Sequence, residues 1–179
     1  MEFSELAKNR YSCRKLSDRP VEKEKLEEIL SIARLSPTAH NDQPYRIFVA
    51  SGEEAVRKIK ETTPCDFGAS LFLLIAAEKK EGWVREFDGK NFAEVDAAIV
   101  ASHVMLSIEA LGLGSTWVAY FDAPKLKKLF PETADYELIA LFPIGYKEKD
   151  AEPSHLHFER RPAPRRACKI SLGKSSPLP

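Results

Sequence analysis

The stretch SLFLLIAAE, residues 70–78, decides the fold, because every position from Leu71 to Ala77 is apolar. Successive side chains of a strand point to opposite faces of a sheet, so a strand of this composition has both faces buried. The run is far too short to cross a bilayer, which takes about 20 apolar residues of a helix. We therefore expect a buried strand in a protein without a membrane segment.

Helical and strand patterns alternate on both sides of this stretch. The expected helices are a short one capped by Ser4 and ended by Arg10, then 25–35, 53–60, 91–111, and one that Asp122 caps with Pro124 in its first turn. The expected strands are 46–51, 115–121 and 137–146. The helix over 91–111 has few charges in its middle and ends at Gly112, which indicates a place in a core or in a subunit interface.

Composition limits the classes of function. The 179 residues suit one domain, and 27 basic residues balance 27 acidic ones, so no charge bias favours nucleic acid or an anionic membrane. The three cysteines lack a C-x-x-C pattern and the four histidines lack zinc-ligand spacing; His155 and His157 are expected on the surface. No signal-peptide pattern opens the chain. These features predict a soluble, cytoplasmic protein without a metal site.

The composition changes near Ala151. Residues 151–179 are rich in Pro, Arg and His and show little periodicity, so they cannot bury much surface on a core of their own. We expect one domain over residues 1–150, followed by a tail that either dangles or lies on another surface.

Residues 10–21, RYSCRKLSDRPV, form the first candidate site. Arg10, Ser12 and Arg14 stand at alternate positions, so extended backbone would turn both guanidinium groups and the hydroxyl to one side. That set of donors suits a phosphate monoester.

Residues 36–49, SPTAHNDQPYRIFV, form a second polar loop that leads into an apolar strand. Asn41 and Gln43 carry amide groups that could read the edge of a flat heterocycle without adding net charge. The same residues could instead order an Asx-type turn.

These two motifs, followed by VDAAIVASHVMLSIEALGLGSTWV at 95–118 and LFPIGY at 141–146, resemble the FMN-dependent nitroreductase family in the right order over nearly the whole chain. The resemblance implies an α+β fold with three layers (α/β/α) and a central, mostly antiparallel sheet. It also implies an obligate homodimer with shared active sites, in which residues 151–179 extend onto the partner subunit.

The resemblance assigns one set of residues to the flavin phosphate. Arg10 and Ser12 would hold the phosphate, with Tyr11 in the same loop, and Arg14 would lie near the pyrimidine side of the ring, where a cation eases reduction. A solvated, helix-flanking Arg14 is the alternative. FERRPAPRR at 158–166 resembles the closing Arg-x-Pro of the family, which makes Arg160 a further phosphate ligand and Arg161 the alternative register.

The resemblance also implies contacts with the ring. The segment that the second subunit would lay against the flavin consists of Pro37, Thr38, Ala39, His40 and Asn41, while Gln43 would order that loop. The segment whose main chain would pass the ring consists of Thr116, Trp117, Val118 and Ala119.

The implied activity is reduction of nitroaromatics, quinones or similar acceptors by NADH or NADPH, through hydride transfer at flavin N5 in a ping-pong cycle without a catalytic side chain. The interval between residue 78 and the long helix is short for the family, so Trp83 and Phe87 would be either a small lid or a surface patch. Two alternatives are an FMN-binding protein without turnover, serving as a flavin store or redox sensor, and an interaction domain without flavin.

Overall fold

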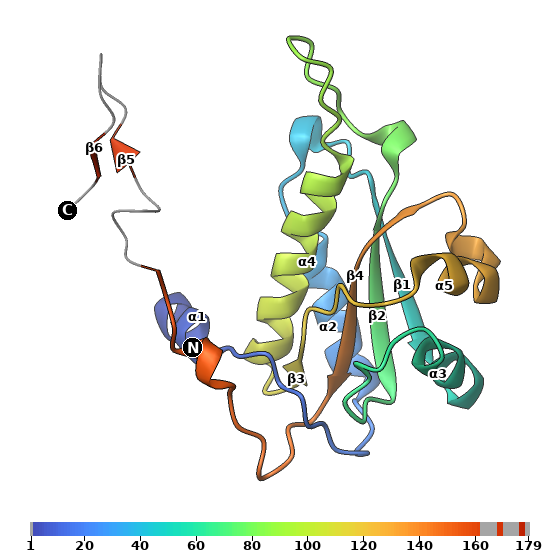
Figure 1. The fold of residues 1–179 in the computed structure, drawn as a ribbon, viewed down its shortest axis with the longest axis vertical. Coiled ribbons are helices and arrows are strands. Elements are labelled where there is room, and N and C mark those ends of the chain that lie inside the picture. The colour runs from blue at the N-terminus through green and yellow to red at the C-terminus, as the bar shows by residue number, and fades with distance from the viewer. Residues whose placement is uncertain (1, 162–167, 170–175, 178–179) are drawn as a thin grey trace.

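A four-stranded antiparallel sheet organises the chain (Figure 1). The computed structural model describes residues 2–161, 168–169 and 176–177. The spatial order of the strands is β1 (Tyr45–Ser51), β2 (Leu71–Ala77), β4 (Glu137–Gly145) and β3 (Gly114–Ser115). Each neighbouring pair runs antiparallel, which agrees with the expected sheet. Within the part of the chain that is described, no helix has the length and apolar character needed to span a bilayer.

Five α-helices surround the sheet in the described residues: α1 (Phe3–Asn9), α2 (Lys23–Ala33), α3 (Glu53–Lys60), α4 (Ala93–Ala110) and α5 (Ala123–Leu129). Short 3-10 turns are η1 (Ala39–Asn41), η2 (Lys79–Glu81), η3 (Pro131–Thr133) and η4 (His155–His157). Near the C-terminus β5 (Cys168–Lys169) pairs with β6 (Ser176–Pro177).

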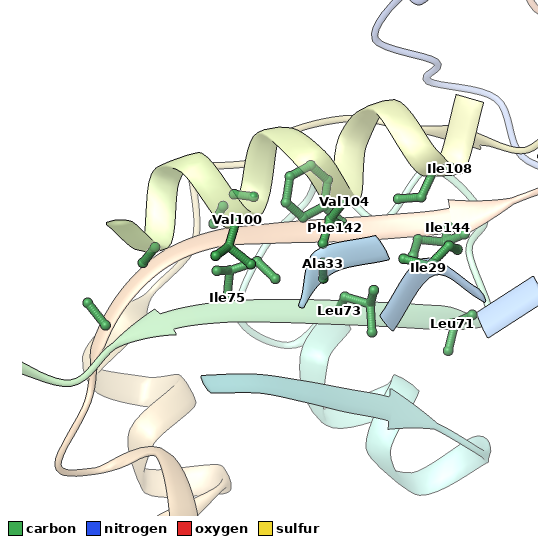
Figure 2. Packing of buried hydrophobic residues seen from close by; sticks show 14 of the residues in the cluster. Ile29, Ala33, Leu71, Leu73, Ile75, Val100, Val104, Ile108, Phe142 and Ile144 are labelled. Atoms are coloured by element: carbon green, nitrogen blue, oxygen red, sulfur yellow. The ribbon is translucent and has the colours of Figure 1, made fainter. Parts of the chain in front are cut away.

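The alternation of side chains along β2 divides the core into two halves. Leu71, Leu73 and Ile75 face α2 and α4, where Figure 2 shows them packed with residues of both helices. Phe72 and Leu74 point the other way, into a cluster with apolar residues of α3 and α5. All seven residues of β2 are buried, which confirms the prediction of a strand covered on both faces.

The long helix α4 lies against the sheet through small residues. Ala93, Ala97 and Ala101 are fully buried, and their short side chains let the helix backbone approach the strands closely. Gly112 has φ 74° just after the helix, a left-handed conformation that only glycine adopts without steric cost. The predicted end of the helix is therefore confirmed.

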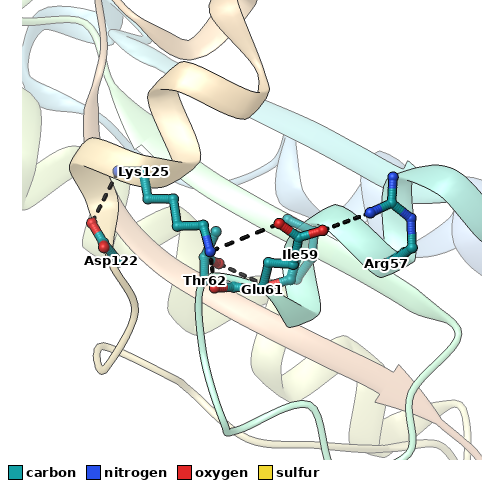
Figure 3. Close-up of polar contacts among 6 residues, drawn as sticks. All are labelled: Arg57, Ile59, Glu61, Thr62, Asp122 and Lys125. Carbon is teal, nitrogen blue, oxygen red and sulfur yellow. Dashed lines mark hydrogen bonds and ion pairs between the residues drawn. The ribbon is translucent and has the colours of Figure 1, made fainter.

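On the face of the sheet away from α2 and α4, polar contacts join α3 to α5 (Figure 3). The Asp122 carboxylate accepts a hydrogen bond from the Lys125 backbone N–H at 2.9 Å, which confirms the predicted cap. The Lys125 ammonium donates to the Glu61 carbonyl at 2.9 Å, and the Glu61 carboxylate pairs with Arg57 at 2.6 Å. These contacts hold the two helices side by side over the sheet.

Two predictions about local structure are wrong. The strand expected over 115–121 is limited to β3 and one bridge between Val118 and Leu141. The chain leaves the sheet because the Tyr120 carbonyl accepts a hydrogen bond from the Thr63 hydroxyl, and the Asp122 N–H donates to the Thr62 carbonyl. Ser4 lies inside α1 rather than at its cap, because the helix already begins at Phe3.

Candidate functional site

The loop after α1 is extended, as the alternating pattern requires. Ser12 bridges Ser115 in parallel, and the Cys13 N–H donates to the Ser115 carbonyl at 2.9 Å. The Thr116 hydroxyl donates to the Cys13 carbonyl at 2.6 Å. Because Cys13 points into the core and is fully buried, Ser12 and Arg14 on either side of it face outward.

The outward side chains of this loop line a pocket of about 180 Å³. Arg160 reaches the same pocket from the other end of the chain. The complete lining is Arg10, Ser12, Arg14, Ser154, Leu156, His157 and Arg160. The structure thus brings together Arg10, Ser12 and Arg160, which were predicted at the phosphate, and Arg14, which was predicted at the pyrimidine side of the ring. Arg161 is exposed and does not line the pocket.

The pocket has a strongly cationic donor set. Within residues 2–161, none of the guanidinium groups of Arg10, Arg14 and Arg160 forms an ion pair with a carboxylate, and no acidic side chain lines the pocket. Arg14 donates to the Ser12 carbonyl at 3.3 Å, and Arg160 donates to the Glu159 carbonyl at 2.7 Å. Several guanidinium N–H groups are therefore left for an anion, and a hydroxyl lies beside them.

Tyr11 connects the two segments that build the pocket. Its hydroxyl donates to the Ala151 carbonyl at 3.1 Å, and its ring meets the His157 ring edge-on at 6.3 Å between centroids. Burial, with the neighbouring Cys13 side chain as the next contribution, raises the pKa of the Tyr11 phenol to about 12. The phenol therefore stays neutral and acts as a structural donor.

His157 is a pocket residue that the sequence interpretation missed. It was expected on the surface together with His155, but it is half-buried and lines the pocket, whereas His155 is exposed. The segment around it has no periodic pattern from which a buried face could be read. The contact that sets His157 apart from His155 is with Tyr11, 146 positions away along the chain.

The loop of Pro37 to Asn41 lies elsewhere. The Ala39 N–H donates at 3.1 Å to the buried carboxylate of Asp96, in the first turn of α4, and the His40 ring stacks on Trp83. His40, Asn41 and Gln43 all have φ between 53° and 60°, a left-handed conformation that costs energy in residues other than glycine. Strain of this kind is concentrated at functional loops.

Gln43 orders this loop, as predicted. Its side-chain amide donates to the Asn41 carbonyl at 3.2 Å, and its backbone N–H donates to the Thr38 hydroxyl at 3.1 Å. The side chain is therefore engaged by its own loop rather than held out for a ligand.

The length of α4 separates this loop from the cationic pocket. Asp96 marks the end of α4 next to the loop, whereas Glu109 at the other end pairs with Lys147, whose ammonium lies 4.7 Å from the centre of the Tyr11 ring. The helix has 18 residues and is about 27 Å long at about 1.5 Å per residue. Because the loop contacts one end of α4 and the segments that line the pocket lie near the other end, one chain does not bring them together. Figure 1 shows α1 and the chain after it near the end of α4 that leads into β3.

The segment from Thr116 to Ala119 lies beside the cationic loop, but most of its side chains belong to the core. Thr116 and Val118 are buried, and Trp117 packs edge-on against Phe142. Both main-chain groups of Val118 are paired with Leu141, so Val118 has no free backbone donor. Ala119 is exposed.

Trp83 and Phe87 do not form one aromatic cluster. Trp83 is half-buried between His40 and Phe92, whereas Phe87 is 96% exposed at the turn of a hairpin closed by the Val84–Asn91 bridge. Trp83 therefore supports the strained loop, and Phe87 is a separate exposed side chain.

A second pocket, of about 190 Å³, opens on the other face of the sheet. It is lined mainly by apolar residues of β1, β2, α3 and η3, among them Phe48, Phe72 and Phe130. It contains none of the predicted site residues, so the cationic pocket is the candidate site.

Known proteins resemble this chain over most of its length. Residues 7–67 and 64–146 match the model of the nitroreductase family. The crystal structure of a nitroreductase family protein from Clostridium difficile is 38% identical, with 97% of this chain and 99% of that chain covered and a TM-score of 0.86. A curated protein from Methanothermobacter thermautotrophicus, whose name combines NADH dehydrogenase with NAD(P)H nitroreductase, is 25% identical over 89% of this chain and 88% of its own length.

A structure from Exiguobacterium sibiricum, solved in complex with FMN, shares the fold at 20% identity, with a TM-score of 0.81 over 93% of this chain and 96% of that one. An antiparallel sheet between two helical layers, with a cationic pocket at one edge, places the chain in the α+β class of proteins. Within that class, this chain belongs to the nitroreductase family. Membership of this family confirms the prediction that the chain is an enzyme of the oxidoreductase class.

Proposed function

We propose that the chain binds FMN, with the phosphate in the cationic pocket, and passes hydride from NADH or NADPH to a small acceptor such as a nitroaromatic or a quinone. The observation that carries this proposal is the meeting of Arg10, Ser12, Arg14 and Arg160 in one pocket without a carboxylate. The FMN complex of a protein with the same fold supports the choice of cofactor.

The pocket fits the phosphate of FMN by charge and by donor type. A phosphate monoester carries a charge of about −1.5 to −2 at neutral pH and three acceptor oxygens. Arg10, Arg160 and the Ser12 hydroxyl would bind these oxygens through charge-assisted hydrogen bonds, which are roughly twice as strong as neutral ones. Arg14 would add a fixed cation that favours the more negative, reduced form of the ring.

FMN, when bound, supplies the hydride chemistry, so the chain needs no nucleophile or acid–base pair of its own. Its side chains would bind and orient the cofactor and both substrates, and exclude water from the reacting face. Variants in the site are therefore expected to act through cofactor affinity and reduction potential.

The site would be completed by a second subunit. The strained Pro37–Asn41 loop is too far from the cationic pocket of its own chain, so it would serve the pocket of a partner. The outward face of α4 supports a dimer, because Val95, Ile99 and Leu106 remain partly exposed there, and the one Asp in that stretch, Asp96, is buried. Residues 154–160 line the pocket of their own chain, so the proposed extension onto the partner begins after Arg161; most of residues 162–179 lie outside the described part of the chain.

The test is an absorbance spectrum of the purified protein before and after anaerobic addition of NADH or NADPH. We expect flavin bands that bleach rapidly with at least one nicotinamide and return on addition of a quinone or nitroaromatic. Flavin bands that stay oxidised with both nicotinamides would instead indicate an FMN store or redox sensor. A colourless protein that cannot be reconstituted with FMN would refute the proposal.

A further inference from the structure

His157 has a position that an exposed tail residue would not need. It lies in the cationic pocket with Arg10, Arg14 and Arg160. We propose that His157 is a further phosphate ligand, which binds in its protonated form and strengthens FMN retention as the pH falls towards 6. This inference rests on the proposed function, since it assigns a residue of the same site.

The position of the His157 ring is set by its packing. The ring lies edge-on to Tyr11 at 6.3 Å and to Phe158 at 4.9 Å between centroids. The His157 backbone N–H donates to the Ser154 carbonyl at 2.8 Å, which closes the η4 turn. A side chain held in this way can offer a ring N–H to an anion at little entropic cost.

The charged groups that face His157 are cationic. Arg10, Arg14 and Arg160 share the pocket, the neutral Tyr11 phenol touches the ring, and Lys147 lies on Tyr11. No carboxylate lines the described pocket. A bound phosphate would therefore be the nearby negative charge that favours a protonated imidazole.

His155 provides a matched control in the same turn. Its side chain is 80% exposed, lies 3.8 Å from the Glu159 carboxylate and does not line the pocket. Histidine is the side chain whose charge ordinarily changes between about pH 5 and pH 8, and the experiment covers that range. Only His157 is placed to pass that charge to a ligand.

The experiment measures FMN dissociation constants by flavin fluorescence at pH 6 and pH 8, for the wild type, His157→Gln, His157→Lys and His155→Gln. The phosphate itself gains a proton near pH 6, so the informative quantity is the ratio of each variant to the wild type at the same pH. We expect His157→Gln to weaken binding about tenfold or more at pH 6 but less than about threefold at pH 8. His157→Lys should bind more tightly than the wild type at pH 8, and His155→Gln should match the wild type at both values.

Riboflavin lacks the phosphate, so its affinity reports contacts with the flavin ring and not contacts with a phosphate in the cationic pocket. His157→Gln should leave riboflavin affinity unchanged, and a thermal melt should show that the variant is folded. Three results would overturn the assignment of His157 and leave the proposed function standing. They are an equal loss of FMN affinity at both pH values, no loss at either value, and an equal loss of affinity for riboflavin. If the wild type binds no FMN, the proposed function is refuted and this inference fails with it.

Discussion

At the residue scale, the site depends on side chains that carry charge without a partner. Most basic side chains of this chain that take part in ion pairs, such as Arg57 with Glu61, lie on exposed surfaces and contribute little to stability. Arg10, Arg14 and Arg160 differ because they converge on one pocket and pair with no carboxylate in the described residues. Like charges held together in this way favour an anionic ligand.

Arg10→Ala is expected to weaken FMN binding by roughly 10- to 100-fold, since a hydrogen bond to a charged group contributes about 1.5–3 kcal/mol. Flavin content after purification and an FMN titration measure the loss. Arg57→Ala, which removes an exposed arginine on α3, is the matched control and should keep wild-type occupancy. Equal flavin content in both variants would count against the phosphate assignment.

At the element scale, a hydrogen bond fastens the start of α2 to the end of the sheet. The Tyr146 hydroxyl donates to the Glu22 carboxylate at 2.6 Å, and Arg19 donates to the same carboxylate group at 2.8 Å. The Tyr146 hydrogen bond, followed by smaller contributions that include Arg19, lowers the pKa of Glu22 from its ordinary value of 4.5 to about 2. A carboxylate with a lowered pKa stabilises the fold above its ordinary value and loses that effect as the pH falls towards 2.

Glu22→Gln should therefore lower the free energy of unfolding at pH 7, and the difference from the wild type should shrink between about pH 4.5 and pH 2. Urea unfolding at several pH values measures this difference. Glu27→Gln on the exposed side of α2 serves as the control, because Glu27 forms only an exposed pair with Lys23. A difference that stays constant with pH would show that Glu22 acts by packing rather than by charge.

The two-sided core of β2 leads to a second prediction at this scale. Ile75 is fully buried between the sheet and α4, so Ile75→Ala should reduce the free energy of unfolding by about 2–5 kcal/mol. Val49→Ala, at a position that is 41% exposed on β1, should cost less than about 1 kcal/mol. Urea denaturation of the three proteins compares them, and similar losses for both variants would contradict the assignment of β2 as the buried centre of the sheet.

At the scale of the whole molecule, the proposed site uses two chains. Arg10 and Asn41 lie at opposite ends of α4, so a site that needs both must take them from different subunits. This arrangement can be tested by complementation. A mixed dimer of one Arg10→Ala subunit and one Asn41→Ala subunit would contain one site with both substitutions and one site with neither.

We expect purified mixed dimers, isolated through two affinity tags, to regain about half of the wild-type FMN occupancy. The two parental homodimers carry one substitution in each site and should both bind FMN weakly. If the sites lay within single chains, every site of the mixed dimer would carry one substitution, and no recovery would be measured. Sedimentation of the untagged protein checks the dimer independently.

The amino-acid sequence by itself determined the features that depend on near neighbours. The apolar run of β2, the cap at Asp122, the end of α4 at Gly112 and the alternation of Arg10, Ser12 and Arg14 follow from local geometry, and the structure agrees with each of them. The order of the motifs was also sufficient to identify the family. The local pattern wrongly predicted that the strand continues through residues 116–121. There, hydrogen bonds to the loop after α3 draw the chain away from the sheet.

Only the tertiary structure decided which distant residues share a site. Arg160 and His157 meet Arg10 because Tyr11 and Ala151 are hydrogen-bonded across 140 positions, a contact that leaves no periodic trace in the sequence. The separation of the Pro37–Asn41 loop from that pocket likewise depends on how α4 lies across the sheet. Periodicity reports which face of an element is buried, whereas the partner on that face is selected by long-range packing and hydrogen bonding, and these exist only in the folded chain.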